Sequence, residues 1–332
     1  MRPAAGLFAA LLLAGCAAPI APLPERPVAV GAAIQVDAEP VPLDPTDPRR
    51  DRIGAFVYAG GVALTSRQTS RLHGMSDLKV SADGRLLAIG DQADMLEARV
   101  VLDAGGRLTG LTGATLVSLK APDGLDLFAG GQREYDSEGI AQLPSGDVVV
   151  SFEQHDRILV FPKGGGLPRP APAPDIRYVD NQGMEALASA PEVAADAYRV
   201  GLESSGHTYI CRLSTTCARD RDLPVEGPDL VAFDNMPGGG LAYLLRTYTA
   251  ARGNVVKLRI IDRQGRLVDA LELARPLTVD NLEGLAAVPR PNGAVRFYLI
   301  ADDNFGYYAG RPTGQRTLLL AFDWRPRREG PR

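Results

Sequence analysis

Residues 136–154, DSEGIAQLPSGDVVVSFEQ, contain the clearest copy of a pattern of acids, apolar residues and a turn. An acid, Glu138, precedes a short apolar segment, a turn rich in Pro, Gly and Asp follows, and a second apolar segment ends at another acid, Glu153. Two short apolar segments joined by a glycine-containing turn are typical of a β-hairpin. The stretch therefore predicts a hairpin with one carboxylate at each of its open ends.

The same pattern recurs at four other places, which begin at Gly74, Asn181, Gly227 and Asp280. Successive leading acids are separated by 61, 47, 44 and 54 residues, close to the roughly 40 to 50 residues of one four-stranded propeller blade. The 36 glycines and 26 prolines interrupt the apolar segments too often for long helices. In chain order, the five leading acids are Asp77, Glu138, Glu185, Asp229 and Glu283.

These repeats predict an all-β fold, a β-propeller with five visible repeats and five or six blades. The two ends of the repeat region also match each other. The segment IGAFVYAGGVAL, residues 53–64, can supply an outer strand to the blade that contains TLLLAFDW, residues 317–324. Such pairing would close the ring without exposed strand edges.

The first strand of each blade lines the channel of a propeller, so the leading acids are expected to face one another. Like charges at close range raise one another's pKa values, so such a ring must hold either protons or a cation, and a hard cation is the favoured solution. We expect Ca²⁺ first, and Mg²⁺ or Mn²⁺ next. An alternative is that the acids cap backbone N–H groups in turns without any cation. The predicted metal ligands are Asp77, Glu138, Glu185, Glu283, Asp302 and Asp303.

A second set of charged residues follows the second strand of each hairpin. We expect Asp91, Glu153, Glu203 and Arg246 to bind substrate, with Arg246 contacting an anionic group. Ion pairs are the alternative: Glu153 or Glu203 with a nearby arginine such as Arg157 or Arg212, and Arg246 with a ring carboxylate. The predicted catalytic residues are Glu138, Glu185, Glu283, Arg246 and the proton donor His73.

The N-terminal residues MRPAAGLFAALLLAGC have the layout of a secretory signal, and their ending resembles a bacterial lipoprotein signal with Cys16 as the acylated residue. We therefore predict a signal peptide at 1–16, a Pro/Ala-rich tether at 17–51, the propeller at 52–326 and a tail at 327–332. The protein is expected to be exported and anchored by lipid to a membrane, facing the periplasm, with the outer membrane favoured, or the cell surface.

The cysteines predict a disulfide, and the net charge limits the kinds of partner that the protein can bind. In an oxidising compartment Cys211 and Cys217 are expected to form a disulfide, with a pair of free thiols as the alternative. A net charge of −4 without a basic stripe argues against nucleic acid. We expect a monomer that meets the membrane only through its anchor and acts on a small ester or phosphorylated molecule.

Together the blocks DSEGI with VSFEQ, QGMEALA with GLES, and DNLEGLA with IADDNF resemble the phytase-like family, described as having esterase-like activity of phytase. The resemblance runs from about Arg52 to Trp324 and implies an exported propeller that hydrolyses an ester with divalent metal help. The chain departs from the family pattern at GDQ, residues 90–92, and at LLRT, around Arg246. When these blocks are matched to those of the family, the recurring acids of the family correspond to Glu138, Glu153, Glu185, Glu203, Glu283, Asp302 and Asp303.

Two other functions stay open at this point. One is a non-catalytic propeller, held by a structural cation, that binds a cell-envelope ligand or protein. The aromatic residues Phe305, Tyr307 and Tyr308 beside Asp302 favour this alternative. The other is a calcium-dependent lactonase. The absence of a G-x-S-x-G motif argues against a serine hydrolase of the α/β type.

Overall fold

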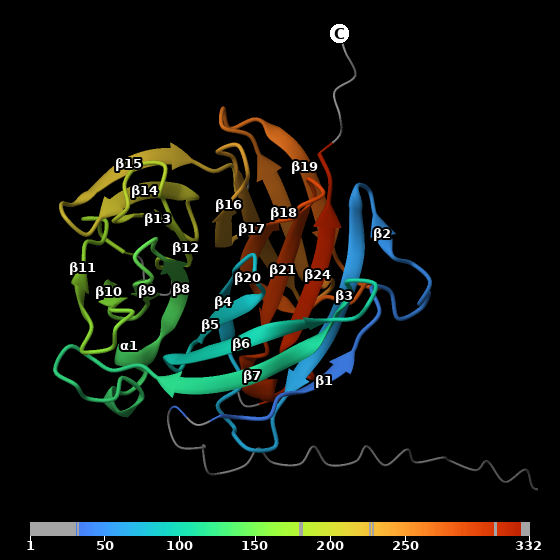
Figure 1. Cartoon of the computed structure of the whole chain (residues 1–332), viewed down its shortest axis with the longest axis horizontal. Helices are drawn as coiled ribbons and strands as arrows, with labels where there is room; N and C mark the ends of the chain where they lie inside the picture. Colours follow the sequence, from blue (N-terminus) through green and yellow to red (C-terminus); the bar gives the residue numbers. More distant parts are fainter. Residues whose placement is uncertain are drawn as a thin grey trace, which may run out of the picture.

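The computed structural model describes residues 31, 33–178, 182–225, 227, 229–308 and 311–326. The predicted signal peptide with Cys16, most of the first half of the predicted tether and the tail 327–332 lie outside the described residues. In the described part the chain forms five sheets arranged in a ring, a five-bladed β-propeller (Figure 1). This confirms the predicted all-β propeller and fixes the number of blades at five.

The first four blades each have four antiparallel strands that run in sequence order from the channel outward. Blade 1 contains β4 (Met75–Val80), β5 (Arg85–Gly90), β6 (Asp94–Leu102) and β7 (Leu108–Ser118). Blade 2 contains β8 (Ser137–Gln142), β9 (Val148–Phe152), β10 (Arg157–Phe161) and β11 (Arg169–Ala171). Blade 3 contains β12 (Ala186–Ser189), β13 (Ala197–Gly201), β14 (His207–Arg212) and β15 (Cys217–Asp222). Blade 4 contains β16 (Asp229–Asn235), β17 (Leu241–Thr249), β18 (Gly253–Ile261) and β19 (Leu267–Leu273).

Blade 5 combines the two ends of the described chain. Its strands follow the order β1, β3, β24, β21 and β20, and a short β2 also pairs with β3. The pairing of β3 with β24 confirms the predicted closure, and Figure 1 shows the two strands side by side. Its strands are β1 (Asp37–Pro40), β2 (Arg52–Ile53), β3 (Phe56–Thr65), β20 (Asn281–Pro289), β21 (Val295–Asp302) and β24 (Leu318–Trp324).

The propeller starts earlier in the chain than the sequence suggested. Residues 37–40 had been assigned to the tether, but β1 pairs with β3 over Asp37↔Thr65 to Pro40↔Val62. Its proline ends an outer strand, where a missing N–H group is tolerated. Leu43, three residues after this proline, is buried in the core between blades 4 and 5. The Pro/Ala-rich composition could not show that residues 37–43 pack against the propeller.

Gly84 and Gly146 illustrate why the hairpins form. Each lies in the turn between the first and second strand of its blade, with φ of 83° and 89°. This left-handed backbone conformation favours glycine. The amide of Gly84 closes its turn by donating to the carbonyl of Ser81, and Gly146 donates to Leu143. The turns found in the sequence therefore fix the position of both hairpins.

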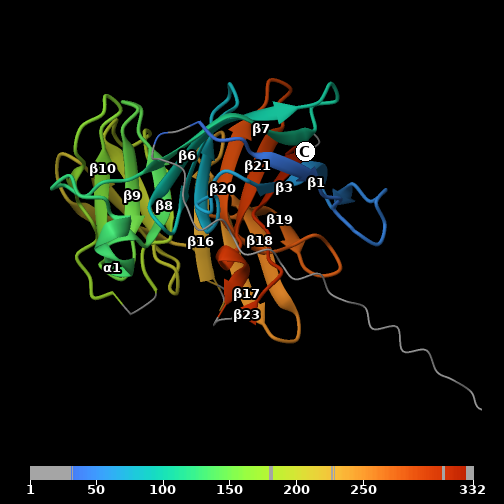
Figure 2. The ribbon, with the colours of Figure 1, turned by 90° about the horizontal axis from the view of Figure 1, so that it is seen from below.

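Buried apolar side chains of the described residues form five clusters, one between each pair of neighbouring blades. The inner strands β4, β8, β12, β16 and β20 contact one another around the ring, and Figure 2 shows β16 beside β20. Cys211 and Cys217 pair across β14 and β15 and form a disulfide, as predicted.

Short helices and a small hairpin complete the described structure. They are η1 (Phe128–Gly130), α1 (Gln132–Tyr135), η2 (Asn304–Gly306) and the pair β22 (Tyr307–Tyr308) and β23 (Arg311–Pro312). None of the helices in the described part of the chain has the length and apolar character that crossing a bilayer would require.

Candidate functional site

A β-bulge recurs at the start of the inner strands. The register shifts between Met75 and Asp77 in β4, and equivalent shifts occur in β8, β16 and β20. A bulge inserts one extra residue and re-aims a side chain. The residues at or beside these bulges are Ser76, Glu138, Val231 and Glu283, and in blade 3 Glu185 directly precedes β12.

A glycine follows Glu138 and Glu283, and the packing explains it. A Cβ atom on Gly139 would lie 2.5 Å from the carbonyl oxygen of Glu185, and one on Gly284 would lie 2.8 Å from the Cα of Asp77. Both separations are too short for a real side chain. The Glu-Gly pair therefore presents a carboxylate while it allows the next inner strand to approach closely.

The leading and trailing acids meet at one end of the channel, called here the acidic mouth. Because the first two strands of a blade are antiparallel, the start of the inner strand lies beside the end of its neighbour. Asp229 pairs with Arg246 in this way, and Asn281 pairs with Asp302. Electrostatic contacts connect nine acids here: Asp91, Asp136, Glu138, Glu153, Glu185, Glu203, Asp229, Glu283 and Asp302.

Two groups of carboxylates within the acidic mouth are compact enough to hold a cation. In each group one oxygen of every member lies within 4.8 Å of the others. Oxygens that bind one Ca²⁺ at about 2.3–2.6 Å are at most about 5 Å apart, so either group fits the ion. The first group is Asp136, Glu138 and Glu153, and the second is Glu153, Glu185 and Glu203. Glu153 belongs to both.

These groups differ from the predicted ligand set. Glu138 and Glu185 are members, as expected, whereas Glu153 and Glu203 had been assigned to substrate binding. Asp136 was not singled out, although it lies two residues before Glu138 in the opening stretch. That acid-x-acid spacing was the available signal.

The environment of the acidic mouth opposes ionisation. Burial and the neighbouring Glu185 raise the pKa of Glu138 well above its ordinary value. Burial followed by the charge of Asp229 raises the pKa of Glu203 to about 7, although Arg246 acts in the opposite direction. Burial raises the pKa of Asp136 to about 6. A divalent cation would offset the repulsion that these carboxylates meet when they ionise.

Arg246 brings a positive charge to the acidic mouth. Its Nη1 group donates to the carboxylate of Glu283 and, at 2.6 Å, to Asn281 Oδ1, while its Nη2 group lies 3.7 Å from Glu203. About one fifth of the side chain is exposed. Arg246 thus forms the ion pair with a ring carboxylate that the sequence left open. Glu283, held by this pair, belongs to neither carboxylate group.

The other predicted ion pairs of the trailing acids do not form. Arg157 contacts Glu134, and Arg212 contacts Asp196. Glu153 instead accepts the backbone N–H of Gly183 at 3.1 Å. The two trailing glutamates therefore face the acidic mouth rather than arginines of their own blades.

Asp303 has a different role from the metal ligand predicted. It accepts the Nδ1 proton of His73 at 2.5 Å, the amide of Gly74 at 3.0 Å and the hydroxyl of Thr317 at 2.9 Å. Burial acts against ionisation, but these donors lower the pKa of Asp303 below its ordinary value. Asp303 is an ionised partner that orients the His73 ring, and neither Asp303 nor Asp302 belongs to a carboxylate group.

Asp302 lies beside the ion pair of Arg246. Its carboxylate accepts the side chain of Asn281 at 2.9 Å and the amide of Asn304 at 2.7 Å. Burial and the charge of Glu283 raise its pKa well above the ordinary value.

Asp77 does not lie in the predicted ring of leading acids. It lies one residue beyond the bulge and is fully buried in the middle of the channel. Its carboxylate accepts the amides of Ile140 in β8 and Leu285 in β20, and it pairs with Lys79 at 2.9 Å. The repeat pattern could not show this because a bulge changes the register by one residue.

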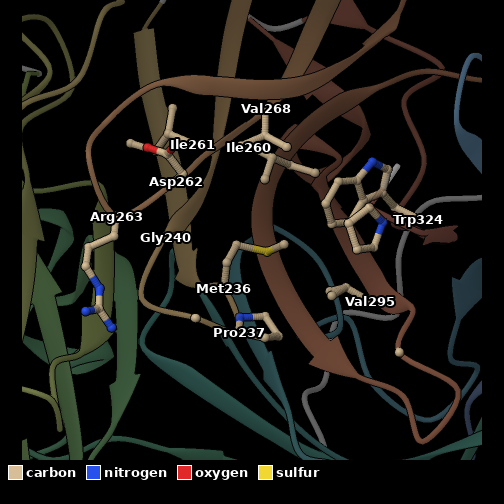
Figure 3. A pocket seen from close by; sticks show the side chains of 13 residues that line it. Met236, Pro237, Gly240, Ile260, Ile261, Asp262, Arg263, Val268, Val295 and Trp324 are labelled. Atoms are coloured by element: carbon tan, nitrogen blue, oxygen red, sulfur yellow. The ribbon is translucent and has the colours of Figure 1, made fainter. Parts of the chain in front are cut away.

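A cavity of about 200 Å³ lies at the opposite end of blades 4 and 5. Figure 3 shows Met236, Val295 and Trp324 at its wall, beside the turns that join β16 to β17 and β18 to β19. Its lining is mostly apolar and includes none of the nine acids of the mouth. We therefore locate the candidate site at the acidic mouth, where groups suited to chemistry converge.

The fold and the site define a five-bladed propeller with an acidic centre at one end of its channel. A model of the phytase-like family, described as esterase-like activity of phytase, matches residues 70–305. Since this is more than half of the chain, the protein belongs to the phytase-like family. The comparison with curated proteins found no match.

Several solved structures are similar in fold. A chain assigned as a gluconolactonase is 12% identical, with 91% of this chain and 92% of that chain covered and a TM-score of 0.45. A gluconolactonase from Xanthomonas campestris is 14% identical, with 90% and 99% covered and a TM-score of 0.42. Virginiamycin B lyase from Staphylococcus aureus is 10% identical, with 87% and 99% covered and a TM-score of 0.43. At these scores the likeness carries nothing about chemistry.

Proposed function

We propose that the protein is a cation-dependent hydrolase of a small ester, either a phosphate monoester or a carboxylic ester, and that the acidic mouth is its active centre. The observation that carries the proposal is the pair of carboxylate groups that share Glu153. Membership of a family described by esterase-like activity supports the reaction class.

The residues that would hold the cation are Asp136, Glu138, Glu153, Glu185 and Glu203. An all-carboxylate set favours a hard ion, and Ca²⁺ tolerates irregular geometry better than Mg²⁺. When bound, such an ion polarises an ester oxygen and lowers the pKa of water.

Other groups of the acidic mouth suit a hydrolase. Because the Nδ1 proton of His73 goes to Asp303, the Nε2 atom is left to accept a proton from water. This makes His73 a base, whereas the sequence suggested a proton donor. Arg246 is partly exposed and carries a permanent charge, so its Nη2 group can contact an anionic part of the substrate.

We also propose that the protein acts outside the cytoplasm as a monomer, anchored through acylated Cys16 to a membrane and facing the periplasm or the cell surface. The disulfide between Cys211 and Cys217 supports export, because such bonds persist in oxidising compartments. A shift in mass of the purified protein, lost when Cys16 is replaced by Ala, would test the anchor.

The proposed activity is tested by stripping the protein with a chelator and titrating it with Ca²⁺ by calorimetry. Hydrolysis of p-nitrophenyl phosphate and p-nitrophenyl acetate is then followed with and without the ion. We expect Ca²⁺ to bind and to restore hydrolysis of one ester. Binding without hydrolysis of either would overturn the enzyme proposal in favour of a non-catalytic propeller. Glu97→Gln, on the exposed face of β6, serves as the control because it lies outside the acidic mouth.

A further inference from the structure

The cavity at the end of blades 4 and 5, opposite the acidic mouth, has an apolar wall and a volume of about 200 Å³. Five of the side chains that line it are less than one tenth exposed: Met236, Ile260, Ile261, Val295 and Trp324. An apolar cavity of about 150 Å³ accommodates benzene, so this one has room for an apolar group of about eight carbon atoms.

A turn of three glycines keeps the cavity open on the side of blade 4. Residues 236–240, MPGGG, join β16 to β17, and this turn has no polar side chain. A Cβ atom on Gly238 would meet no other atom within 4 Å, and the same holds for Gly293 in the neighbouring turn of blade 5. Both glycines line the cavity. The space beside them is therefore free for a ligand.

Arg263 brings a positive charge to the rim of the cavity. Its exposed side chain lies over the glycine turn, since a Cβ atom on Gly239 would be 3.0 Å from its Nε atom and 3.3 Å from its Nη2 atom. The adjacent acid, Asp262, pairs instead with Arg266 at 2.7 Å. In the part of the chain that the structure describes, no acid pairs with Arg263. Its guanidinium is therefore available to an anion.

The other polar side chains of the lining already have partners. Trp324 Nε1 donates to Asp269 Oδ2 at 2.9 Å. The carboxylate of Asp262 accepts the backbone amides of Gln264 and Arg266, each at 2.9 Å. A molecule in the cavity would therefore meet apolar side chains and one available positive charge.

We propose that this cavity binds a small monocarboxylate with an apolar body, its carboxylate at Arg263 and its body against Met236 and Trp324. A guanidinium can hold a carboxylate through two parallel N–H···O bonds, and one cation balances one negative charge. Figure 3 shows Met236 between Arg263 and Trp324, so the charge and the indole lie on opposite sides of the cavity. The inference goes beyond the proposed hydrolysis and needs neither the cation nor catalysis.

The fluorescence of Trp324 provides the test, because Trp324 is the only tryptophan of the sequence. The full chain is titrated with octanoate and, separately, with octanamide, an uncharged molecule of the same length. We expect octanoate to change the emission saturably and to bind about tenfold or more tightly than octanamide, the contribution of a hydrogen bond to a charged group. Equal affinities, or no saturable change, would overturn the proposal.

Arg263→Gln tests the position of the carboxylate. The variant should lose the preference for octanoate and keep the wild-type affinity for octanamide. Arg290→Gln is the matched control, because it removes the same charge from the turn between β20 and β21 but Arg290 does not line the cavity. Salt screens a charge that makes no contact, so this control should weaken octanoate binding by less than about twofold. Equal losses in the two variants would show a general charge effect and overturn the site.

Val268→Phe tests the position of the apolar body. Val268 lines the cavity and is 47% exposed, so a larger side chain there can be accommodated by the fold. The variant should weaken octanoate and octanamide alike by about fourfold or more, the equivalent of one displaced CH₂ group. Unchanged binding of both would place the ligand elsewhere.

A second copy of the chain is the other candidate occupant of the cavity. Emission of Trp324 that depends on protein concentration, together with a dimer in sedimentation without octanoate, would assign the cavity to self-association and overturn the proposal. A monomer with constant emission supports the small ligand.

Discussion

The middle of the channel and the acidic mouth both contain buried carboxylates, but the two regions balance their charge in different ways. In the middle, Asp77 and Asp234 each accept backbone amides from neighbouring inner strands. Lys79 lies between the blades and donates to Asp77 and to the carbonyls of Phe233 and Leu285. At the acidic mouth, Arg246 interacts with four of the nine acids, Glu283, Glu185, Glu203 and Asp229. The protein itself therefore supplies the partners of the acids in the middle, whereas for the acidic mouth we propose a cation from outside.

The largest effect is expected from Lys79→Met, which leaves Asp77 buried without its cation. Loss of one partner of a buried ion pair costs about 3–5 kcal/mol. Urea unfolding should show a loss of this size, and Ca²⁺ should not reverse it, because Lys79 lies away from the carboxylate groups. Lys120→Met, at an exposed position, should leave the unfolding free energy within about 0.5 kcal/mol. A cost below about 1 kcal/mol for Lys79→Met would contradict the internal balance described above.

Glu153→Gln should weaken the binding of Ca²⁺ without lowering stability, which is the reverse of the result expected for Lys79→Met. The substitution removes the carboxylate that both groups share, so the affinity for Ca²⁺ should fall by about 100-fold or more. Stability without the ion should not fall, because one repelling acid is gone. Calorimetric titration and thermal unfolding measure both quantities. A variant that binds Ca²⁺ as tightly as the wild-type protein would remove Glu153 from the proposed cation site.

Gly139→Ala tests whether the inner strands must approach as closely as they do beside Glu138. The added Cβ atom meets the carbonyl oxygen of Glu185, directly before β12, so we expect a loss of about 1–3 kcal/mol in unfolding free energy, as for other overpacked positions. Gly164→Ala is the control, because a Cβ atom there has open space and the backbone conformation is not left-handed. Equal stability of the two variants would show that the strands can separate at no cost.

The smallest effect expected is that of pH on the ion-free protein. The pKa of Glu203 rises to about 7 and that of Asp136 to about 6 on folding, from ordinary values of 4.5 and 3.8. A raised folded-state pKa stabilises the protein below the unfolded value and loses that contribution as pH rises through the folded value. The melting temperature without Ca²⁺ should therefore fall between pH 5 and pH 8, and saturating Ca²⁺ should reduce the fall. A melting temperature that rises with pH in the absence of the ion would contradict this.

The sequence predicted the propeller because its hairpins repeat a local pattern of acid, apolar strand and turn. The pairing of β3 with β24, which closes the ring, was also predicted, because both segments have the composition of strands and lie at the two ends of the repeat region. The contribution of β1 was missed because its pairing depends on a partner strand rather than on its own composition. Local pattern thus predicted which segments form strands, while the edge of the last blade depended on tertiary packing.

The candidate site was predicted in outline and corrected in detail. Glu138, Glu153, Glu185 and Glu203 were all identified, but their division into metal and substrate ligands could not be read from spacing. Asp77 was predicted to lie with them because a comparison of the repeats cannot show the β-bulge that shifts the register before Asp77. The shared position of Glu153 arises where two neighbouring blades meet, and only the three-dimensional arrangement shows it.

The construction of blade 5 also bears on the order of events during biosynthesis. The strands β1 and β3 are made before the four complete blades, and their partner β24 is made after them. Until then β3 lacks the neighbour that connects it to β21, and the ring stays open between its first and last blades. Folding that depends on contacts this distant in sequence is slow. A nascent or truncated chain that ends before β24 should therefore remain a substrate for chaperones and proteases, even though four complete blades precede the break.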